Sequence, residues 1–185
     1  MSMDTITINS TSITLTMGDI VLANTEALVN AANSDLAGGG GVDGAIHTAG
    51  GPDIHVACHE IVTKQGPIPP GKAVITTGGK LPVKCVIHAV GPIWYGGKNN
   101  EAETLASAYS ESLKLATSKN LESVAFPSLS TGAYHYPVDQ ASEIALKTIA
   151  NYLRLNKTTL KEVRFVLYDI VTYKSYAQAL SEINT

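Results

Sequence analysis

Two asparagines, a run of glycines and one aspartate stand close together early in the chain. Asn30 and Asn33 end an apolar segment, glycines occupy positions 38–41, and Asp43 follows at the start of a predicted helix. Glycine loses more backbone freedom on folding than any other residue, so consecutive glycines indicate a need for bare backbone. Backbone amides that lead into a helix N-terminus form an anion site, and phosphate is its common occupant.

Asp43 is the residue in this stretch best suited to catalysis. The positive end of a helix favours an ionised carboxylate, and such a carboxylate can orient or deprotonate a water molecule. A helix-start aspartate can instead cap backbone amides, so the sequence leaves both roles open. His47 lies one helical turn later on the same face, where it either contacts a ligand or supports the glycine loop.

A second loop of similar character occupies residues 130–137, with the sequence STGAYHYP between a predicted strand and a predicted helix. Either loop alone could be an ordinary tight turn. Two amide-rich loops at neighbouring strand ends could instead grip the two phosphates of a pyrophosphate. The pair therefore favours a ligand that carries a diphosphate.

The glycines at 39, 41 and 44 also fit the G-x-G-x-x-G pattern of dinucleotide-binding folds. In that motif the glycines follow their strand directly, whereas residues 30–37 intervene here. No strand that ends in an acidic residue follows at the distance where the ribose partner belongs. The chain also has no Gly-Lys-Ser/Thr sequence. These departures argue against a Rossmann or Walker site.

The elements that must position these residues alternate between short apolar strands and longer helical patterns. Strands are predicted at 4–9, 12–20, 27–32, 72–79, 84–92, 123–129 and 162–169, and helices at 42–50, 53–66, 102–120, 138–156 and from about 171. Such interleaving is typical of an α/β fold with a mostly parallel sheet buried on both faces. The first two strands are expected to form an antiparallel edge. Ligands of such sheets bind at the carboxyl ends of the strands, where the loops described above lie.

Composition limits the class of protein further. The 185 residues are 44% hydrophobic and 16% charged, with a net charge of −3, which predicts one globular domain over residues 1–185 and no basic footprint for nucleic acid. The two cysteines, Cys58 and Cys85, are too few for a disulfide framework, so we expect a reducing, cytoplasmic location. The first residues have no signal-peptide pattern, and no apolar run is long enough to span a membrane.

Taken in order, several segments resemble the macrodomain family, and specifically its MacroD-type branch. They are GDI (18–20), VNAAN (29–33), GGGGVDGAIH (38–47), AVITTGGKLP (73–82), VIHAVGP (86–92) and FPSLSTGAYHYP (126–137). The resemblance implies a three-layer α/β/α fold around a mixed sheet, with a cleft for ADP-ribose. It also implies hydrolysis, without a metal or other cofactor, of O-acetyl-ADP-ribose or of mono-ADP-ribose esters on acidic side chains of proteins.

The resemblance implies a role for each matching residue. Asp19 binds the adenine amino group beside the Ile20 backbone, and Asn33 binds the distal ribose and takes part in catalysis with Asp43. Amides of one loop are supplied by Gly39, Gly40, Gly41 and Val42, and those of the other by Ser130, Thr131, Gly132, Ala133 and Tyr134, whose ring packs on the distal ribose. The resemblance leaves open whether Asp43 or the bound phosphate activates the water.

Three residues belong to the predicted ligand-binding set on weaker grounds. Tyr168, at the end of the last predicted strand, is placed to pack on the adenine. Asn30 either contacts the ligand or holds its loop together, since asparagine side chains readily satisfy nearby backbone groups. His47 either contacts the ligand or supports the glycine loop.

A metal site is the alternative to this interpretation. His55, Cys58 and His59 are spaced three and four residues apart on a predicted helix and could converge as zinc ligands. A stable site needs further ligands and supporting partners, and the zinc-dependent branch of macrodomains carries extra ligands near the glycine loop that are absent here. We therefore expect a core cysteine flanked by surface histidines.

Two rival functions remain. One is an ADP-ribose reader that has the same cleft without turnover. The other is an RNA-associated module, because an adenine pocket can accept the end of an adenylate chain. The acidic balance and the few aromatic residues argue against strong nucleic-acid binding.

Overall fold

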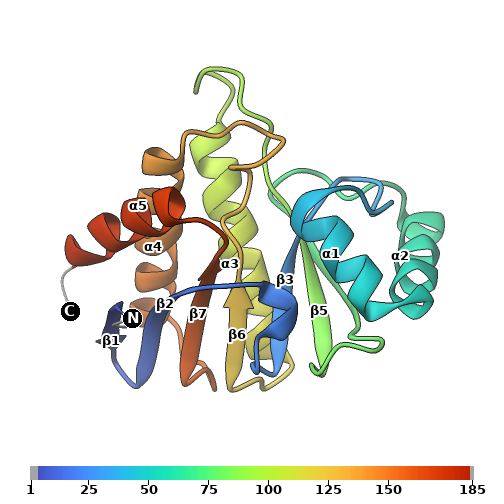
Figure 1. Cartoon of the computed structure of the whole chain (residues 1–185), viewed down its shortest axis with the longest axis horizontal. Coiled ribbons are helices and arrows are strands. Elements are labelled where there is room, and N and C mark those ends of the chain that lie inside the picture. The colour runs from blue at the N-terminus through green and yellow to red at the C-terminus, as the bar shows by residue number, and fades with distance from the viewer. Residues whose placement is uncertain (1–3, 184–185) are drawn as a thin grey trace.

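One seven-stranded sheet organises the computed structural model, which describes residues 4–183 (Figure 1). Its strand order is β1-β2-β7-β6-β3-β5-β4. The strands are Asp4–Ile8 (β1), Thr11–Met17 (β2), Ala27–Ala32 (β3), Ala73–Thr77 (β4), Cys85–Val90 (β5), Ser123–Phe126 (β6) and Glu162–Leu167 (β7). The five strands from β2 to β5 in this order are parallel, and β1 pairs antiparallel with β2. The mixed, mostly parallel sheet with an antiparallel first edge is confirmed.

The other edge of the sheet is antiparallel as well, which the sequence patterns did not reveal. β4 pairs with β5 in antiparallel register, with Ile75 opposite Ile87. The connection between these strands is short and contains no helix. Parallel neighbours need a long crossover, so a short connection forces the antiparallel arrangement.

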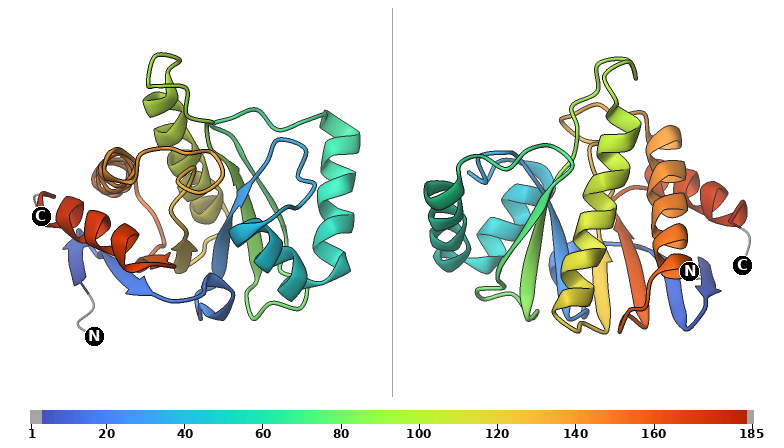
Figure 2. Two further views of the ribbon diagram at one scale, coloured as in Figure 1. Left: turned by 45° about the horizontal axis from the view of Figure 1, so that its top comes forward. Right: turned by 180° about the vertical axis from the view of Figure 1, so that it is seen from behind.

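Helices cover both faces of the sheet and give the predicted three layers (Figure 2). They are Gly41–Gly50 (α1), Pro52–Gln65 (α2), Glu101–Ser118 (α3), Val138–Leu155 (α4) and Ile170–Ser181 (α5), with a 3-10 turn at Ile20–Leu22 (η1). One apolar cluster joins α3, α4 and α5 to one face, and a second joins α1 and α2 to the other. Among residues 4–183, no helix combines the length and apolarity that crossing a bilayer requires.

Strand alternation decides which side chains lie beneath α1. On β3, Ala27 and Val29 belong to the cluster on the α3 side, whereas Leu28 and Ala32 belong to the cluster on the α1 side. Asn30 takes the intervening position on the α1 side, because successive strand side chains point to opposite faces. The same alternation on β5 puts His88 on that face, between Val86 and Val90. Asn30 and His88 are direct register partners.

Six of the seven strands end earlier than predicted, and two of them end three residues early. The segment 12–20 stops at Met17, where Gly18 takes a φ of +157° and Asp19 then caps η1. The segment 123–129 stops at Phe126, because Pro127 has no N–H to continue the ladder. In both cases the chain leaves the sheet at the carboxyl ends of its parallel strands.

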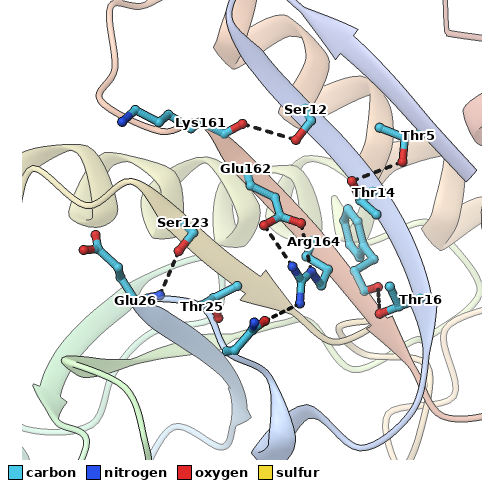
Figure 3. Close-up of polar contacts among 12 residues, drawn as sticks. Thr5, Ser12, Thr14, Thr16, Thr25, Glu26, Ser123, Lys161, Glu162 and Arg164 are labelled. Atoms are coloured by element: carbon cyan, nitrogen blue, oxygen red, sulfur yellow. Dashed lines mark hydrogen bonds and ion pairs between the residues drawn. The ribbon is translucent and has the colours of Figure 1, made fainter. Parts of the chain in front are cut away.

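Arg164 on β7 anchors the segment between β2 and β3 (Figure 3). Its guanidinium donates to the two carboxylate oxygens of Glu162 at 2.9 and 3.0 Å and to the Asn24 Oδ1 at 2.7 Å. Glu26, just before β3, donates its N–H to the Ser123 Oγ on β6 at 2.8 Å. These contacts fasten the chain that follows Asp19.

Candidate functional site

A cleft with two adjoining lobes runs along the carboxyl ends of β3, β6 and β7. The Asp43 lobe has a volume of about 440 Å³ and the Asp19 lobe about 550 Å³. Four residues line both lobes, namely Gly41, Val42, Ser128 and Gly132. Because parallel strands end at one edge of a sheet, loops far apart in sequence meet here.

The predicted residues fall into these lobes almost as a set. The Asp43 lobe is lined by Asn33, Gly39, Gly40, Gly41, Val42, Asp43, Ser130, Gly132, Ala133 and Tyr134. The Asp19 lobe is lined by Asp19, Ile20, Thr131 and Tyr168 among others. Asn30 and His47 line neither lobe, since both side chains are buried beneath the cleft. Their burial favours a supporting position, which is the alternative that the sequence left open for both residues.

The Asn33 side chain shapes the glycine loop. Its Nδ2 donates to the Gly38 carbonyl at 2.9 Å, and its Oδ1 accepts from the Ala37 N–H at 3.1 Å. Gly38 and Gly41 have φ values of +80° and +57°, which favour glycine. A Cβ on Gly40 would meet no protein atom within 4 Å, and Gly40 lines the lobe, so a side chain there would enter ligand space.

Gly44, the last glycine of the G-x-G-x-x-G match, has a packing function. A Cβ at this position would overlap the Gly39 carbonyl oxygen. The first turn of α1 therefore lies directly against the glycine loop, which leads straight into the N-terminus of this helix. This arrangement has the features of an anion site.

Asp43 lies in the first turn of α1 and is 7% exposed. Asn30 Nδ2 donates to Asp43 Oδ1 at 2.7 Å. His47 Nε2 is 3.3 Å from the same oxygen, but neither ring nitrogen of His47 makes a hydrogen bond with residues 4–183. Burial lowers the pKa of His47, although the Asp43 charge opposes this. The carboxylate is thus held from one side and borders the lobe on the other.

A buried polar chain continues below Asn30. Asn30 Nδ2 also lies 3.1 Å from His88 Nδ1, and His88 Nε2 lies 2.8 Å from the Thr76 Oγ1 on β4. The Thr76 hydroxyl donates to the Thr77 carbonyl at 3.0 Å. Burial lowers the pKa of His88 to about 3, so the ring is neutral. Sequence reasoning missed His88, although a lone histidine in the apolar strand VIHAV was a visible signal.

The cluster with potential metal ligands differs from the predicted one. His55 and His59 are exposed and Cys58 is buried, which confirms a core cysteine between surface histidines. The structure instead gathers ligand atoms of His47, Cys58 and His88 within 4.8 Å of one another. Both nitrogens of His88 already have partners, and burial together with the Asp43 charge raises the pKa of the Cys58 thiol to about 11. Because both of its nitrogens are engaged, His88 would have to give up a hydrogen bond to bind a metal.

The second loop is held by residues that the sequence analysis did not single out. Tyr176 on α5 donates to the Ser128 Oγ at 3.0 Å, and the Thr131 hydroxyl donates to the same oxygen at 2.8 Å. The Leu129 N–H donates to the hydroxyl of Tyr109 at 3.0 Å. Both tyrosine rings are fully buried. The hydroxyls of core tyrosines thus connect the loop to α3 and α5.

The Asp19 lobe has a polar rim and an apolar wall. Asp19 is exposed and caps η1 by accepting the Val21 N–H at 3.1 Å. Ile20 and Val166 are buried in its wall. Tyr168 is 84% exposed at the edge, where its ring is available to cover a flat ligand. Such a lobe suits a planar heterocycle with an exocyclic amine.

The chain is similar in sequence and in structure to several known proteins. The Macro domain family matches residues 29–145. A macro domain-containing protein of Caldanaerobacter subterraneus is 55% identical over 93% of this chain and 97% of its own. A Klebsiella pneumoniae protein named O-acetyl-ADP-ribose deacetylase is 50% identical over 89% of this chain and 94% of its own. A solved mutant of the Oceanobacillus iheyensis macrodomain with ADPR is 40% identical, covers 97% of each chain and has a TM-score of 0.92.

Proposed function

Since the chain belongs to the macrodomain family, we propose that it is a hydrolase that binds ADP-ribose and deacetylates O-acetyl-ADP-ribose. One observation carries the proposal: a buried carboxylate, Asp43, borders a lobe whose opposite walls are bare backbone and the Tyr134 loop. Relatives named O-acetyl-ADP-ribose deacetylase at about 50% identity over most of the chain support it.

The ligand would lie along both lobes. In this arrangement adenine occupies the Asp19 lobe, where the Asp19 carboxylate accepts from the exocyclic amine and Tyr168 covers the ring. The diphosphate lies between the glycine loop and the loop 130–134, where both supply amides and the N-terminus of α1 adds its positive end. The distal ribose then reaches Asn33, Asp43 and the Tyr134 ring.

Hydrolysis needs a water molecule, a base and a leaving ribose oxygen. In the proposed mechanism the Asp43 carboxylate orients the water and accepts its proton as the water oxygen attacks the acetyl carbonyl carbon. The bond between that carbon and the ribose oxygen then breaks, and the ribose oxygen takes up the proton that Asp43 accepted. ADP-ribose and acetic acid leave, the acid ionises to acetate, and the Asp43 carboxylate is restored. A phosphate oxygen of the ligand is the alternative base, and the ligand would then supply part of its own catalysis.

Acetate release tests the proposal directly. Wild type and Asp43→Ala are assayed with O-acetyl-ADP-ribose, with and without EDTA, and ADP-ribose binding is titrated for both. EDTA-insensitive turnover that Asp43→Ala loses while binding persists supports the enzyme. Tight binding without turnover of this ester leaves either a reader or a hydrolase of a different ADP-ribosyl ester. Asp43→Asn, which keeps shape without a base, separates the carboxylate from the phosphate, because turnover retained in this variant assigns the base to the phosphate.

Three finer points belong to the same proposal. An ester of ADP-ribose with an aspartate or glutamate side chain has the same bond to break, so mono-ADP-ribosylated proteins are proposed as further substrates. We also propose that residues 1–185 form one macro domain, since strands from both ends of the chain share one sheet. A cytoplasmic location is proposed from the two free cysteines, Cys58 and Cys85.

A further inference from the structure

We propose that His88 is a positioning residue for Asp43 and acts on it through Asn30. This inference rests on the proposed function, in which the Asp43 carboxylate orients the attacking water. His88 lies on β5 and Asn30 on β3, directly opposite each other in the parallel register. Both are fully buried, and neither lines the cleft. An effect of His88 on turnover must therefore pass through a neighbour.

The orientation of the Asn30 amide follows from its contact with Asp43. A carboxylate oxygen only accepts hydrogen bonds when ionised, so the group 2.7 Å from Asp43 Oδ1 must be the Asn30 NH₂. The second hydrogen of that NH₂ points to His88 Nδ1 at 3.1 Å. Both donors of Asn30 are then used, one on each side.

The tautomer of His88 follows in turn. Because Nδ1 accepts from Asn30, the ring hydrogen must be on Nε2. Nε2 lies 2.8 Å from Thr76 Oγ1, whose own hydrogen goes to the Thr77 carbonyl. Thr76 Oγ1 therefore accepts from the ring N–H. The donor and the acceptor of each hydrogen bond between Thr76 and Asp43 are then defined. A flipped amide at Asn30 would put two acceptors against each other at Asp43.

The burial of His88 preserves this arrangement over the working pH range. Its pKa, lowered to about 3 chiefly by burial, keeps Nδ1 unprotonated and able to accept. A protonated ring would donate from Nδ1 and repel the Asn30 NH₂. The neutral ring thus keeps the Asn30 NH₂ directed at Asp43. The hydrogen bond from this NH₂ then holds the Asp43 carboxylate in one orientation at the lobe.

Kinetics of three variants test this role. His88→Leu removes the hydrogen bonds to Asn30 and Thr76 and the 3.7 Å contact of Nε2 with the Cys58 Sγ. His88→Asn returns an acceptor close to the Nδ1 position, and His59→Leu on the surface of α2 is the matched control. We expect kcat for O-acetyl-ADP-ribose to fall about 10- to 100-fold in His88→Leu. KM and the Kd for ADP-ribose should stay within about threefold, since His88 does not line the cleft. His88→Asn should recover most of kcat, and His59→Leu should match wild type.

A double mutant separates positioning from a general loss of structure. If His88 acts through Asn30, His88→Leu should change kcat little in an Asn30→Ala background, because residues in one network are not additive. Independent, multiplicative losses would overturn the proposal. So would an unchanged kcat per folded molecule in His88→Leu, with only the thermal stability lowered.

Nitrogen NMR of ¹⁵N-histidine-labelled wild type gives a readout that needs no turnover. We expect the His88 hydrogen on Nε2 and none on Nδ1 at neutral pH, and the reverse tautomer would refute the hydrogen-bond chain. If wild type releases no acetate, the proposed function fails while the NMR result still decides the chain. If wild type is active and His88→Leu keeps its kcat, only the positioning role fails.

Discussion

Gly91 and Ser130 pack so closely that a Cβ on Gly91 would overlap the Ser130 Oγ. Ser130 has a φ of +66°, an uncommon conformation for serine. Its hydroxyl oxygen is buried and has no hydrogen-bond partner among residues 4–183, while the residue itself borders the Asp43 lobe. The loop after β5 therefore packs closely against a strained residue of the loop after β6, and the Ser130 hydroxyl is buried at this contact.

Gly91→Ala is expected to weaken ADP-ribose binding about tenfold, or about 1.4 kcal/mol, because the new methyl group pushes Ser130 out of place. Isothermal titration measures the change. The double variant Gly91→Ala/Ser130→Ala removes the overlapping Oγ and should bind more tightly than Gly91→Ala alone. Equal affinities for the two variants would show that the contact does not act through the Ser130 hydroxyl.

Gly44→Ala and Gly40→Ala are expected to fail in different ways. A Cβ on Gly44 overlaps the Gly39 backbone, so this variant should lose about 1–3 kcal/mol of unfolding free energy as well as ligand affinity. A Cβ on Gly40 meets only open space in the lobe, so stability should be kept and affinity lost. Thermal unfolding and titration on both variants check this contrast, and equal melting temperatures would contradict it.

Tyr109→Phe is expected to destabilise the protein by about 1–3 kcal/mol, because it leaves the buried Leu129 N–H without an acceptor. Ligand affinity should fall with it, since Leu129 leads into the loop of Ser130. Tyr95→Phe, at a tyrosine that is 68% exposed, is the matched control and should change neither property. Denaturant unfolding provides the measurement, and a Tyr109→Phe variant as stable as wild type would remove this support from the loop.

Stability should fall on acidification below about pH 6.5. The folded pKa of His88 is lowered to about 3, so the unfolded chain binds a proton there that the folded chain does not. The contribution of His88 is complete above the unfolded value of about 6.5 and is lost as the pH falls toward 3, with a slope of up to about 1.4 kcal/mol per pH unit. His47, whose pKa burial also lowers, acts in the same direction.

Urea unfolding of wild type and His88→Asn between pH 4 and 7 checks this dependence. The variant should have a shallower slope, because one titrating group with a lowered pKa is gone. Substitution of the exposed His59 by Gln should leave the slope as in wild type. Identical slopes in His88→Asn and wild type would mean that other groups produce the acid dependence.

The sequence patterns were sufficient for the fold class and most of the cleft. Strand alternation, helical periodicity and the positions of glycine and proline are local signals, and they placed the loops of Asn33, Asp43 and Ser130 at strand ends. The parallel interior strands then bring those ends together without any further information. The second antiparallel edge was not predicted, although only residues 80–83 separate the predicted strands 72–79 and 84–92, which is too short a connection for a parallel crossover.

The residues beneath and behind the cleft needed the tertiary structure. Asn30 and His88 are 58 positions apart and meet only because β3 and β5 are neighbours in a particular register. Ser128 meets Tyr176 only because α5 packs on the sheet beside the loop. The sequence by itself determined which elements form and which residues their loops present to a ligand, since those properties depend on neighbours along the chain. The tertiary structure decided which buried side chains support Asp43 and Ser130, because hydrogen-bond partners across strands depend on register and packing.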